Sequence, residues 1–443
     1  MWKKNRRIEL LGLLAFFMTA PAAAQQPLSL RTLVSQALEK NYQVQIVKNE
    51  AVIAQNNNTP GNAGFWPSVT LSGEQSLRVE NTRTDFYNGE TRTGSNAQST
   101  ALNAMVEMNW KVFDGMKMFA RKDRLGFLQK LGSLDTRFYL EQTAADLGKA
   151  YYQLIKERHL LKAYRKSLHI SAYRLRLQDQ KRNVGAAGTL AYNQARVDYN
   201  TDSALVAEKA TQIDNLEIRI NELINRSLTK ALDTRVDTLA PSGIKAQQIL
   251  VDSALAANVE LQQAHVRSLV ADAERRVQLG DRYPEVSVFG RYGFSRQTSE
   301  SGFLAAGQNY GPAFGVQVRF NLFNGGKERR EIRNAEIRKE NSQLEKSSTR
   351  QMIRAGVIRN YNTYKGLQKQ YQISRQSLDA AQQSLQIAEK QLAEGAIDGN
   401  DFRRTQERLI QTRIRVVELQ YALKATELDL QRLTGNLLEE LLH

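Results

Sequence analysis

The amino-acid sequence contains two copies of one pattern, and this duplication restricts the fold more than any other feature. Early in each copy, matching residues lie 217 positions apart: Ala37-Leu38 with Ala254-Leu255, Asn41 with Asn258, and Trp66-Pro67 with Tyr283-Pro284. Later in each copy the separation is 210: Phe113-Asp114-Gly115 with Phe323-Asn324-Gly325, Tyr151 with Tyr361, and Gly185-Ala186 with Gly395-Ala396. The separation changes once, so one loop between residues 79 and 113 is seven residues longer than its counterpart. Matches that keep their order in this way indicate two structural repeats, over residues 25–240 and 241–443.

Residues 1–24 have the three parts of a secretory signal peptide. Basic residues between Lys3 and Arg7 precede an apolar stretch from Leu10 to Thr19, and Ala22-Ala23-Ala24 offers a small-residue cleavage site. The alternative is an N-terminal anchor helix, but the apolar stretch is well short of the ~20 residues that a membrane-spanning helix needs. We therefore predict cleavage after Ala24 and export of the mature chain.

Composition excludes several classes of protein. The chain has no cysteine, which excludes disulfides, thiolate metal sites, a thiol nucleophile and a lipid-modified N-terminal cysteine. Its net charge of +16 could attract nucleic acid or anionic lipid, but basic and acidic residues are interspersed along helical stretches, as in Glu328-Arg329-Arg330-Glu331. We interpret these charges as solvated helix faces and predict no nucleic-acid partner.

The chain also lacks the residue patterns of an enzyme. No i, i+4 pair and no H-E-x-x-H motif occurs among its histidines, which are His159, His169, His265 and His443. Gly326-Lys327 lacks the spacing of a phosphate-binding loop, and no G-x-S-x-G motif is present. We therefore predict no catalytic residues, no metal site, no cofactor and no enzymatic activity.

Each repeat contains one region that alternates like a β-hairpin. Apolar and polar residues alternate in four stretches: after Trp66-Pro67, from Leu102 to Val112, from Val286 to Phe294 and from Phe314 to Leu322. The alternation predicts hairpins over about 68–112 and about 285–322, with strands of about ten residues. One apolar and one polar face suit a barrel in an outer membrane. A soluble hairpin packed on a core would alternate in the same way, so the strands alone do not decide between the two.

Very long helices are predicted after each hairpin. Asp114 and Asn324 are candidate N-caps, and nothing afterwards strongly breaks a helix over about 115–183 or about 325–393. A run of this length spans on the order of 100 Å. Glycines then mark tight turns, and return helices are predicted over about 189–226 and about 400–434.

The second return helix carries an apolar heptad. Residues of this kind recur every seven positions at Phe402, Leu409, Val416, Leu423 and Leu430, and a second apolar seam lies beside them. A strict seven-residue repeat of apolar residues predicts that this helix supercoils in a left-handed sense around a neighbouring helix. Two seams favour neighbours on both sides, as in a closed wall of helices, and an ordinary four-helix bundle is the alternative.

One chain supplies too few strands for a membrane barrel. An unpaired strand edge in lipid leaves bare N–H and C=O groups, each at a cost of several kcal/mol. Two hairpins give four strands, whereas the smallest single-chain barrels have about eight. Copies of the chain must therefore combine, and a barrel with an open lumen favours three or more of them.

The residues together resemble the TolC family of outer-membrane efflux and secretion channels. The resemblance covers essentially the whole mature chain, and the order and spacing of the motifs carry it: the duplication, Trp66-Pro67 and Tyr283-Pro284, Phe113-Asp114-Gly115 and Phe323-Asn324-Gly325, and the turns Val184-Gly185 and Glu394-Gly395. The implied fold class is mainly α with a membrane β-barrel portion. A homotrimer would form a 12-stranded barrel in the cell outer membrane and a long α-helical barrel in the periplasm, where most of the chain would lie.

The resemblance also assigns roles to the turn residues. Gly185, Gly188, Gly395 and Gly399 would form the periplasmic entrance, with Asp398, Asp401 and Arg404 as candidate gate or adaptor contacts. A ring of Asp401 carboxylates would select cations. The equivalent first-turn position is Ala191, and Arg404 stands where some members have another acidic residue, so cation selection is in doubt. Capping of the helix start is the alternative role for Asp401.

The resemblance implies a passive exit duct. Its partners would be a periplasmic adaptor protein, an inner-membrane transporter of the RND or ABC type and outer-membrane lipid, in a tripartite efflux pump or a type I secretion system. The rival is an exported coiled-coil structural or adhesive protein without a pore. An adhesin would not need hairpins duplicated and placed before each long helix, and the transported substrate is not encoded in any recognisable motif.

Overall fold

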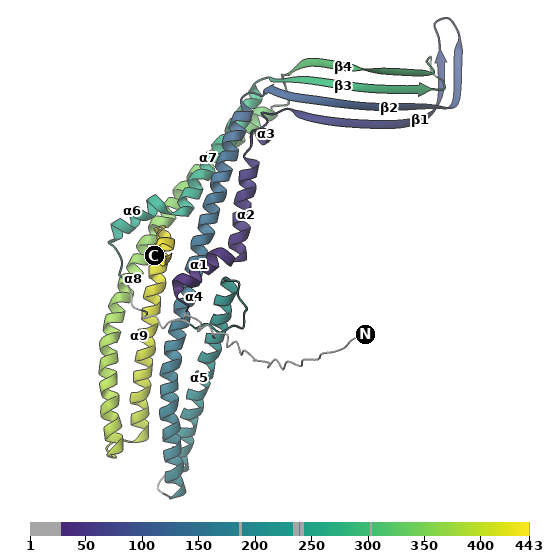
Figure 1. Cartoon of the computed structure of the whole chain (residues 1–443). Coiled ribbons are helices and arrows are strands. Elements are labelled where there is room, and N and C mark those ends of the chain that lie inside the picture. The colour runs from purple at the N-terminus through teal and green to yellow at the C-terminus, as the bar shows by residue number, and fades with distance from the viewer. Residues whose placement is uncertain (1–27, 186–187, 234–238, 240–242, 302–303, 443) are drawn as a thin grey trace, which may run out of the picture.

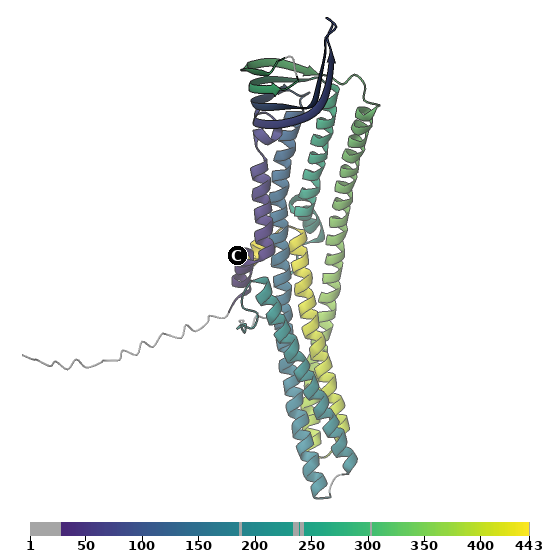
Figure 2. The same cartoon turned by 90° about the vertical axis from the view of Figure 1, so that its right-hand side faces the viewer.

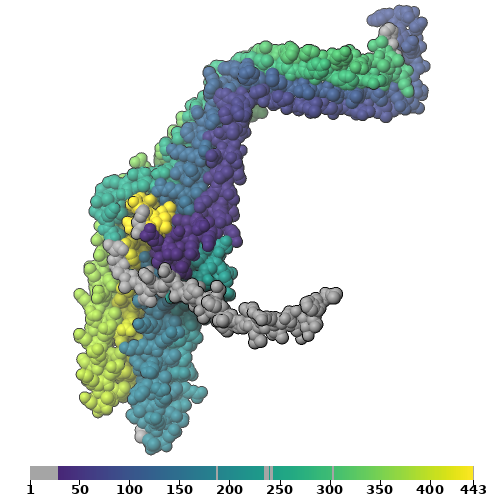
Figure 3. Space-filling model, in the orientation of Figure 1, coloured from purple at the N-terminus to yellow at the C-terminus, as the bar shows by residue number. Residues whose placement is uncertain are grey.

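The computed structural model describes residues 28–185, 188–233, 239, 243–301 and 304–442. The predicted signal peptide, residues 1–24, lies outside the described residues. A β-sheet extends away from one end of the molecule, and long helices run from its base to the opposite end (Figure 1). The space-filling view shows the same division into a narrow sheet and a thicker helical part (Figure 3).

The two predicted hairpins join in one antiparallel sheet. Its strands are β1 (Ser68–Asp85), β2 (Thr91–Phe113), β3 (Glu285–Ser299) and β4 (Ala306–Arg319), in that spatial order. The strands have 18, 23, 15 and 14 residues, so the expected length of about ten was wrong. The alternation of apolar residues marks only part of each strand, because the ends of β1 and β2 are polar and rich in Asn, Thr and Arg.

The second hairpin is shorter than the predicted range of 285–322. Strand β4 ends at Arg319, which pairs with Glu285 at the start of β3. The next position of β4 would face Pro284, which has no N–H to donate to the ladder. Proline therefore ends the pairing, although the apolar alternation continues to Leu322.

Strand register reproduces both separations of the sequence repeat. Ser68 pairs with Asn109 in the first hairpin, and Glu285 pairs with Arg319 in the second. Ser68 and Glu285 are 217 positions apart, and Asn109 and Arg319 are 210 positions apart, which are the two separations of the sequence repeat. The two hairpins are therefore equivalent residue by residue.

Two pairs of long helices make up most of the molecule. The outgoing helices are α4 (Lys117–Asn183) and α8 (Lys327–Ala393), each of 67 residues, and they are about 100 Å long. The return helices are α5 (Thr189–Leu223) and α9 (Gly399–Leu433), each of 35 residues. Figure 2 shows the two hairpins of helices side by side, with their turns at the end farthest from the sheet.

The long helices start and stop where the backbone turns left-handed. Met116 and Gly326, with φ of 66° and 74°, precede α4 and α8. The candidate cap Asp114 is therefore two residues early, although its Oδ1 accepts a hydrogen bond from the Met118 N–H at 3.0 Å. At the other end, Asn225 with φ of 49° stops the return helix α5 before the expected residue 226.

Shorter helices precede each strand hairpin along the chain. In the first repeat they are α1 (Leu30–Lys40), α2 (Tyr42–Asn57) and α3 (Pro60–Ala63). In the second they are α6 (Gln247–Ala257), α7 (Val259–Leu279) and a 3-10 turn, Gly280–Arg282; α10 (Leu437–Leu442) follows α9.

One asparagine in each repeat ties these short helices to the return helix. The Asn41 side chain donates to the Leu223 carbonyl, and the Asn258 side chain donates to the Leu433 carbonyl, both at 3.0 Å. Each contact satisfies a carbonyl at a helix C-terminus, where the helix itself supplies no partner. Both asparagines also separate two helices, so the repeated Ala-Leu-x-x-Asn motif marks a break in the helix.

The largest apolar core lies midway along the helical part, where α1, α4, α5 and α10 meet. Leu33, Leu147, Leu154, Ile220 and Leu437 are completely buried there. Among the described residues, no helix is both long enough and apolar enough to cross a membrane. The core therefore stabilises the helical part, and the apolar surface of the sheet lies outside it.

Candidate functional site

The sheet has one exposed apolar face and two free edges. Leu71, Leu77, Phe314 and Val316 keep between 63% and 81% of their surface exposed. Neighbouring positions on the same strands, such as Ser72 and Gln317, face the opposite side because strand residues alternate. In the single chain, β1 and β4 are the edge strands, and each lacks a partner along its outer side. This ribbon has the apolar surface that lipid would cover, but it cannot close on itself.

The predicted turn glycines belong to the two turns between α4 and α5 and between α8 and α9, and both turns lie at the end of the molecule farthest from the sheet (Figures 1 and 2). Gly185 and Gly395 both have φ of +75°, a left-handed conformation that favours glycine. Their N–H groups donate to the carbonyls of Arg182 and Leu392 at 3.0 and 3.2 Å, which closes the last turn of α4 and of α8. Gly188 precedes α5, and Gly399 is the first residue of α9.

Asp398 caps α9, and Asp401 does not. The Asp398 Oδ1 accepts hydrogen bonds from the N–H groups of Asn400 and Asp401 at 2.9 and 2.8 Å. Asp401 lies in the first turn, where its Oδ1 is 3.5 Å from Arg404 Nη1, and both side chains are mostly exposed. The capping role that the sequence offered for Asp401 therefore belongs to Asp398.

We expect Asp398→Ala to destabilise α9 by about 0.5–2 kcal/mol, since it removes the side chain that satisfies two backbone donors. Asp401→Ala is the matched control, and its effect should stay below about 1 kcal/mol because its ion pair is solvated. Thermal unfolding followed by helical circular dichroism measures both. Equal losses in the two variants would contradict the assignment of the cap.

A buried polar cluster near the turns joins the two repeats, and the sequence did not reveal it. We call it the tip cluster: Ser167 and Ser171 of α4, Asp202 of α5 and Arg403 of α9. The Arg403 guanidinium donates two hydrogen bonds to the Asp202 carboxylate, at 2.9 and 3.1 Å. Ser167 and Ser171 also donate to Asp202, the former at 2.8 Å.

The tip cluster is largely withdrawn from water. Asp202 is 2% exposed, and the Arg403 side chain is 11% exposed. Burial alone would raise the pKa of Asp202, but hydrogen bonds from Arg403, Ser171 and Ser167 outweigh it and hold that pKa below its ordinary value. A bidentate pair of this kind fixes the angle between α9 and the first helical hairpin.

Acid should weaken the tip cluster. Because the folded pKa of Asp202 lies below its ordinary value of 3.8, its stabilising contribution is complete above that pH and is lost as the pH falls through the folded pKa. We expect the difference in unfolding free energy between the wild type and Asp202→Asn to shrink over this acidic range. Thermal unfolding of both proteins across the range measures it, and a constant difference would contradict the prediction.

Two further contacts cross between the repeats higher up. Lys149 of α4 pairs with Asp429 of α9 at 2.7 Å. Arg137 of α4 pairs with Glu141 at 2.8 Å and also donates to the Ala257 and Gly435 carbonyls of the second repeat. Burial, only partly offset by Arg137, raises the pKa of Glu141. The two repeats are thus held together along most of α4.

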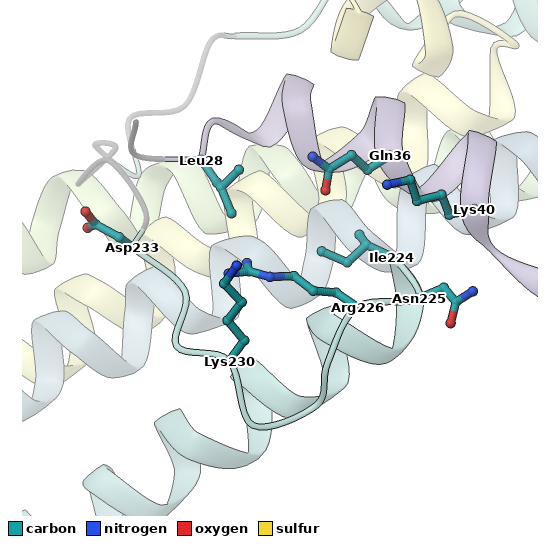
Figure 4. Close-up of a pocket in the computed structure, with 8 residues that line it drawn as sticks. All are labelled: Leu28, Gln36, Lys40, Ile224, Asn225, Arg226, Lys230 and Asp233. Carbon is teal, nitrogen blue, oxygen red and sulfur yellow. The ribbon is translucent and has the colours of Figure 1, made fainter. Parts of the chain in front are cut away.

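The described residues include no candidate metal centre, and the hollow in Figure 4 has a mainly basic lining. Among them, no group of three or more His, Asp or Glu side chains is placed to hold a metal ion. A hollow of about 380 Å³ beside the end of α5 is lined by Leu28, Gln36, Lys40, Ile224, Asn225, Arg226, Lys230 and Asp233 (Figure 4). Its lining includes three cations and one carboxylate, without the paired acid and base or the nucleophile that catalysis requires.

Comparison with known proteins agrees with the resemblance noted in the sequence. Residues 250–436 match the family model described as outer membrane efflux protein. No curated protein matches the chain. The agreement confirms the resemblance to the TolC-type channels.

Solved structures show the same fold over 92% of this chain. A membrane protein from Pseudomonas aeruginosa is 18% identical, with a TM-score of 0.76, over 92% of this chain and 93% of that one. The outer membrane protein VceC from Vibrio cholerae is 16% identical, with a TM-score of 0.74, over 92% and 96%. The CmeC outer membrane channel from Campylobacter jejuni is 15% identical, with a TM-score of 0.75, over 92% and 86%. The predicted fold class is confirmed at the level of the single chain.

Proposed function

We propose that this chain is the exit-duct subunit of an efflux or secretion system. Residues 250–436 match the outer membrane efflux protein model, and the fold is similar to that of the solved channels. One observation carries the proposal: a ribbon with an exposed apolar face stands at the head of helical hairpins about 100 Å long. Such a ribbon suits lipid, and such helices suit the depth of a periplasm.

The ribbon requires other copies of the chain. Four strands with two free edges would expose unpaired backbone groups to lipid, at several kcal/mol each. Three copies would supply twelve strands, enough for a barrel with an open lumen. The polar strand face would line that lumen, and the apolar face would contact the outer membrane. We therefore propose a homotrimer with its helices in the periplasm.

Transport through this duct is passive. The energy would then come from a partner. We propose a periplasmic adaptor protein that docks on the helical hairpins and an inner-membrane transporter of the RND or ABC type. The cargo is then chosen by the transporter, whether the system exports small molecules or proteins.

The helical turns are the proposed periplasmic entrance. The turns contain Gly185, Gly188, Gly395 and Gly399, and Asp398, Asp401 and Arg404 belong to the second turn and the start of α9. Because Arg404 lies beside Asp401, it offsets part of the negative charge that a threefold ring of Asp401 would carry.

We expect Asp401→Ala to lower cation preference modestly, and Arg404→Ala to raise it, since the ring then keeps its full negative charge. Single-channel recordings in planar bilayers measure conductance and ion selectivity for both variants. Unchanged selectivity in both would remove Asp401 and Arg404 from the entrance.

Fractionation separates the duct from the rival, an exported coiled-coil structural or adhesive protein. The duct should appear in the outer-membrane fraction, need detergent for extraction, and run as an oligomer that dissociates on heating. An elongated protein that is released into water without detergent would support the rival and contradict the duct.

A further inference from the structure

We infer that β4 of one copy pairs antiparallel with β1 of the next copy in one particular register, with Phe314 opposite Leu77; this inference rests on the proposed function. The internal duplication supplies the register. In the single chain, β2 of the first repeat already pairs with β3 of the second. The junction between copies joins the same two kinds of strand, β4 from a second repeat to β1 from a first repeat.

The pairing between copies follows when each residue of the β2–β3 pairing is replaced by its counterpart in the other repeat. Ala104 of β2 lies opposite Phe294 of β3. The counterpart of Ala104, 210 positions later, is Phe314, and the counterpart of Phe294, 217 positions earlier, is Leu77. Both separations are those that relate the two hairpins in the structure. The same conversion places Val316 opposite Gln75.

The inferred register keeps the apolar face continuous, which the conversion did not assume. In β4, Phe314 and Val316 share the exposed apolar face, and in β1 that face is formed by Leu71, Leu77 and Val79. A shift of one residue would set Phe314 against Ser76 or Arg78, because strand side chains alternate between faces. The apolar face would then break at every junction between copies.

Exposed apolar residues on the helices indicate the same neighbour. Within the chain, Leu134 of α4 packs with Val259 of α7, with Phe127 beside them. The counterparts of these three residues are Leu344, Tyr42 and Ile337, which are 62%, 66% and 47% exposed. Tyr42 belongs to the first repeat, and the other two belong to α8 of the second. A second copy of the chain in the equivalent position would bury all three.

Disulfide cross-linking tests the register, because the natural chain has no cysteine. The double variant Leu77→Cys/Phe314→Cys should form covalent dimers and trimers on oxidation in outer-membrane vesicles, since directly opposite residues have Cβ atoms about 4.5–5.5 Å apart. Leu77→Cys/Val318→Cys is the matched control on the same face. It should cross-link about tenfold less, because four strand residues add about 13 Å. Each single variant should give no covalent trimer.

A second pair lies outside the membrane and covers the case in which the strand variants fail to insert. Tyr42→Cys/Leu344→Cys should cross-link neighbouring copies, whereas Tyr42→Cys/Met352→Cys, about two helical turns away, should not. Preferred linkage of the control pairs would overturn the register while leaving the duct intact. A detergent-extracted protein that is monomeric by mass would overturn the proposed function as well.

Discussion

Asp202→Ala is expected to lower the free energy of unfolding by about 1–3 kcal/mol, because it removes the buried acceptor of two Arg403 hydrogen bonds and leaves Arg403 with its ion pair to Glu407 at 2.8 Å. The loss should concentrate at the tip, where Arg403 and Gln406 of α9 donate to Asp202 and Ser167 of the first helical hairpin. Chemical unfolding in detergent, with hydrogen exchange of α9, measures both the size and the place of the effect.

Two controls make this expectation specific. Thr412 is the counterpart of Asp202 in the second repeat, and Thr412→Ala should cost less than about 1 kcal/mol, since its hydroxyl bonds only to the Arg408 carbonyl of its own helix. The double variant Asp202→Leu/Arg403→Met removes both charges and should recover most of the loss. If Asp202→Ala and Thr412→Ala destabilise equally, the tip cluster does not hold the repeats together.

Val106→Arg should prevent stable insertion into the outer membrane. Val106 lies on the exposed apolar face of β2, and a cation on the lipid face near the middle of a membrane costs about 2–4 kcal/mol. Three copies would carry three such charges around one barrel, so the loss is multiplied in the assembly. The variant should be depleted from the outer-membrane fraction and degraded or retained in the periplasm.

Glu107→Arg is the matched control on the adjacent residue. Its side chain points to the opposite face of the strand, so the duct should still assemble, with a changed preference between anions and cations. Outer-membrane fractionation followed by single-channel recording separates the two outcomes. Equal insertion of both variants would mean that the apolar face of the sheet does not contact lipid.

The duplication made the largest features predictable from the sequence. Gly185 and Gly395 stand where the backbone needs a positive φ at the end of a helix. The turns and the limits of α4 and α8 could therefore be placed within a few residues. The ends of β1 and β2 could not, since polar strand residues beyond the apolar stretch have no period that separates them from a loop.

Side-chain partners were less predictable than backbone. The sequence offered Asp401 as a possible cap. The choice between Asp398 and Asp401 depends on the residue at which α9 begins, and that residue is Gly399. Arg403 was invisible as a functional residue because it stands among many exposed arginines. Only the packing of α9 against α4 brings it to Asp202, which is 201 positions away in the chain. A buried ion pair between residues so far apart in the chain produces no recognisable motif in the sequence around either residue.

Electron cryo-microscopy of the protein in lipid nanodiscs shows whether the sheets of sister copies complete one wall within lipid. We expect a threefold particle in which β4 of each copy pairs with β1 of the next inside the disc and the helices extend together on one side. A single copy whose sheet folds against its own helices in water would contradict it.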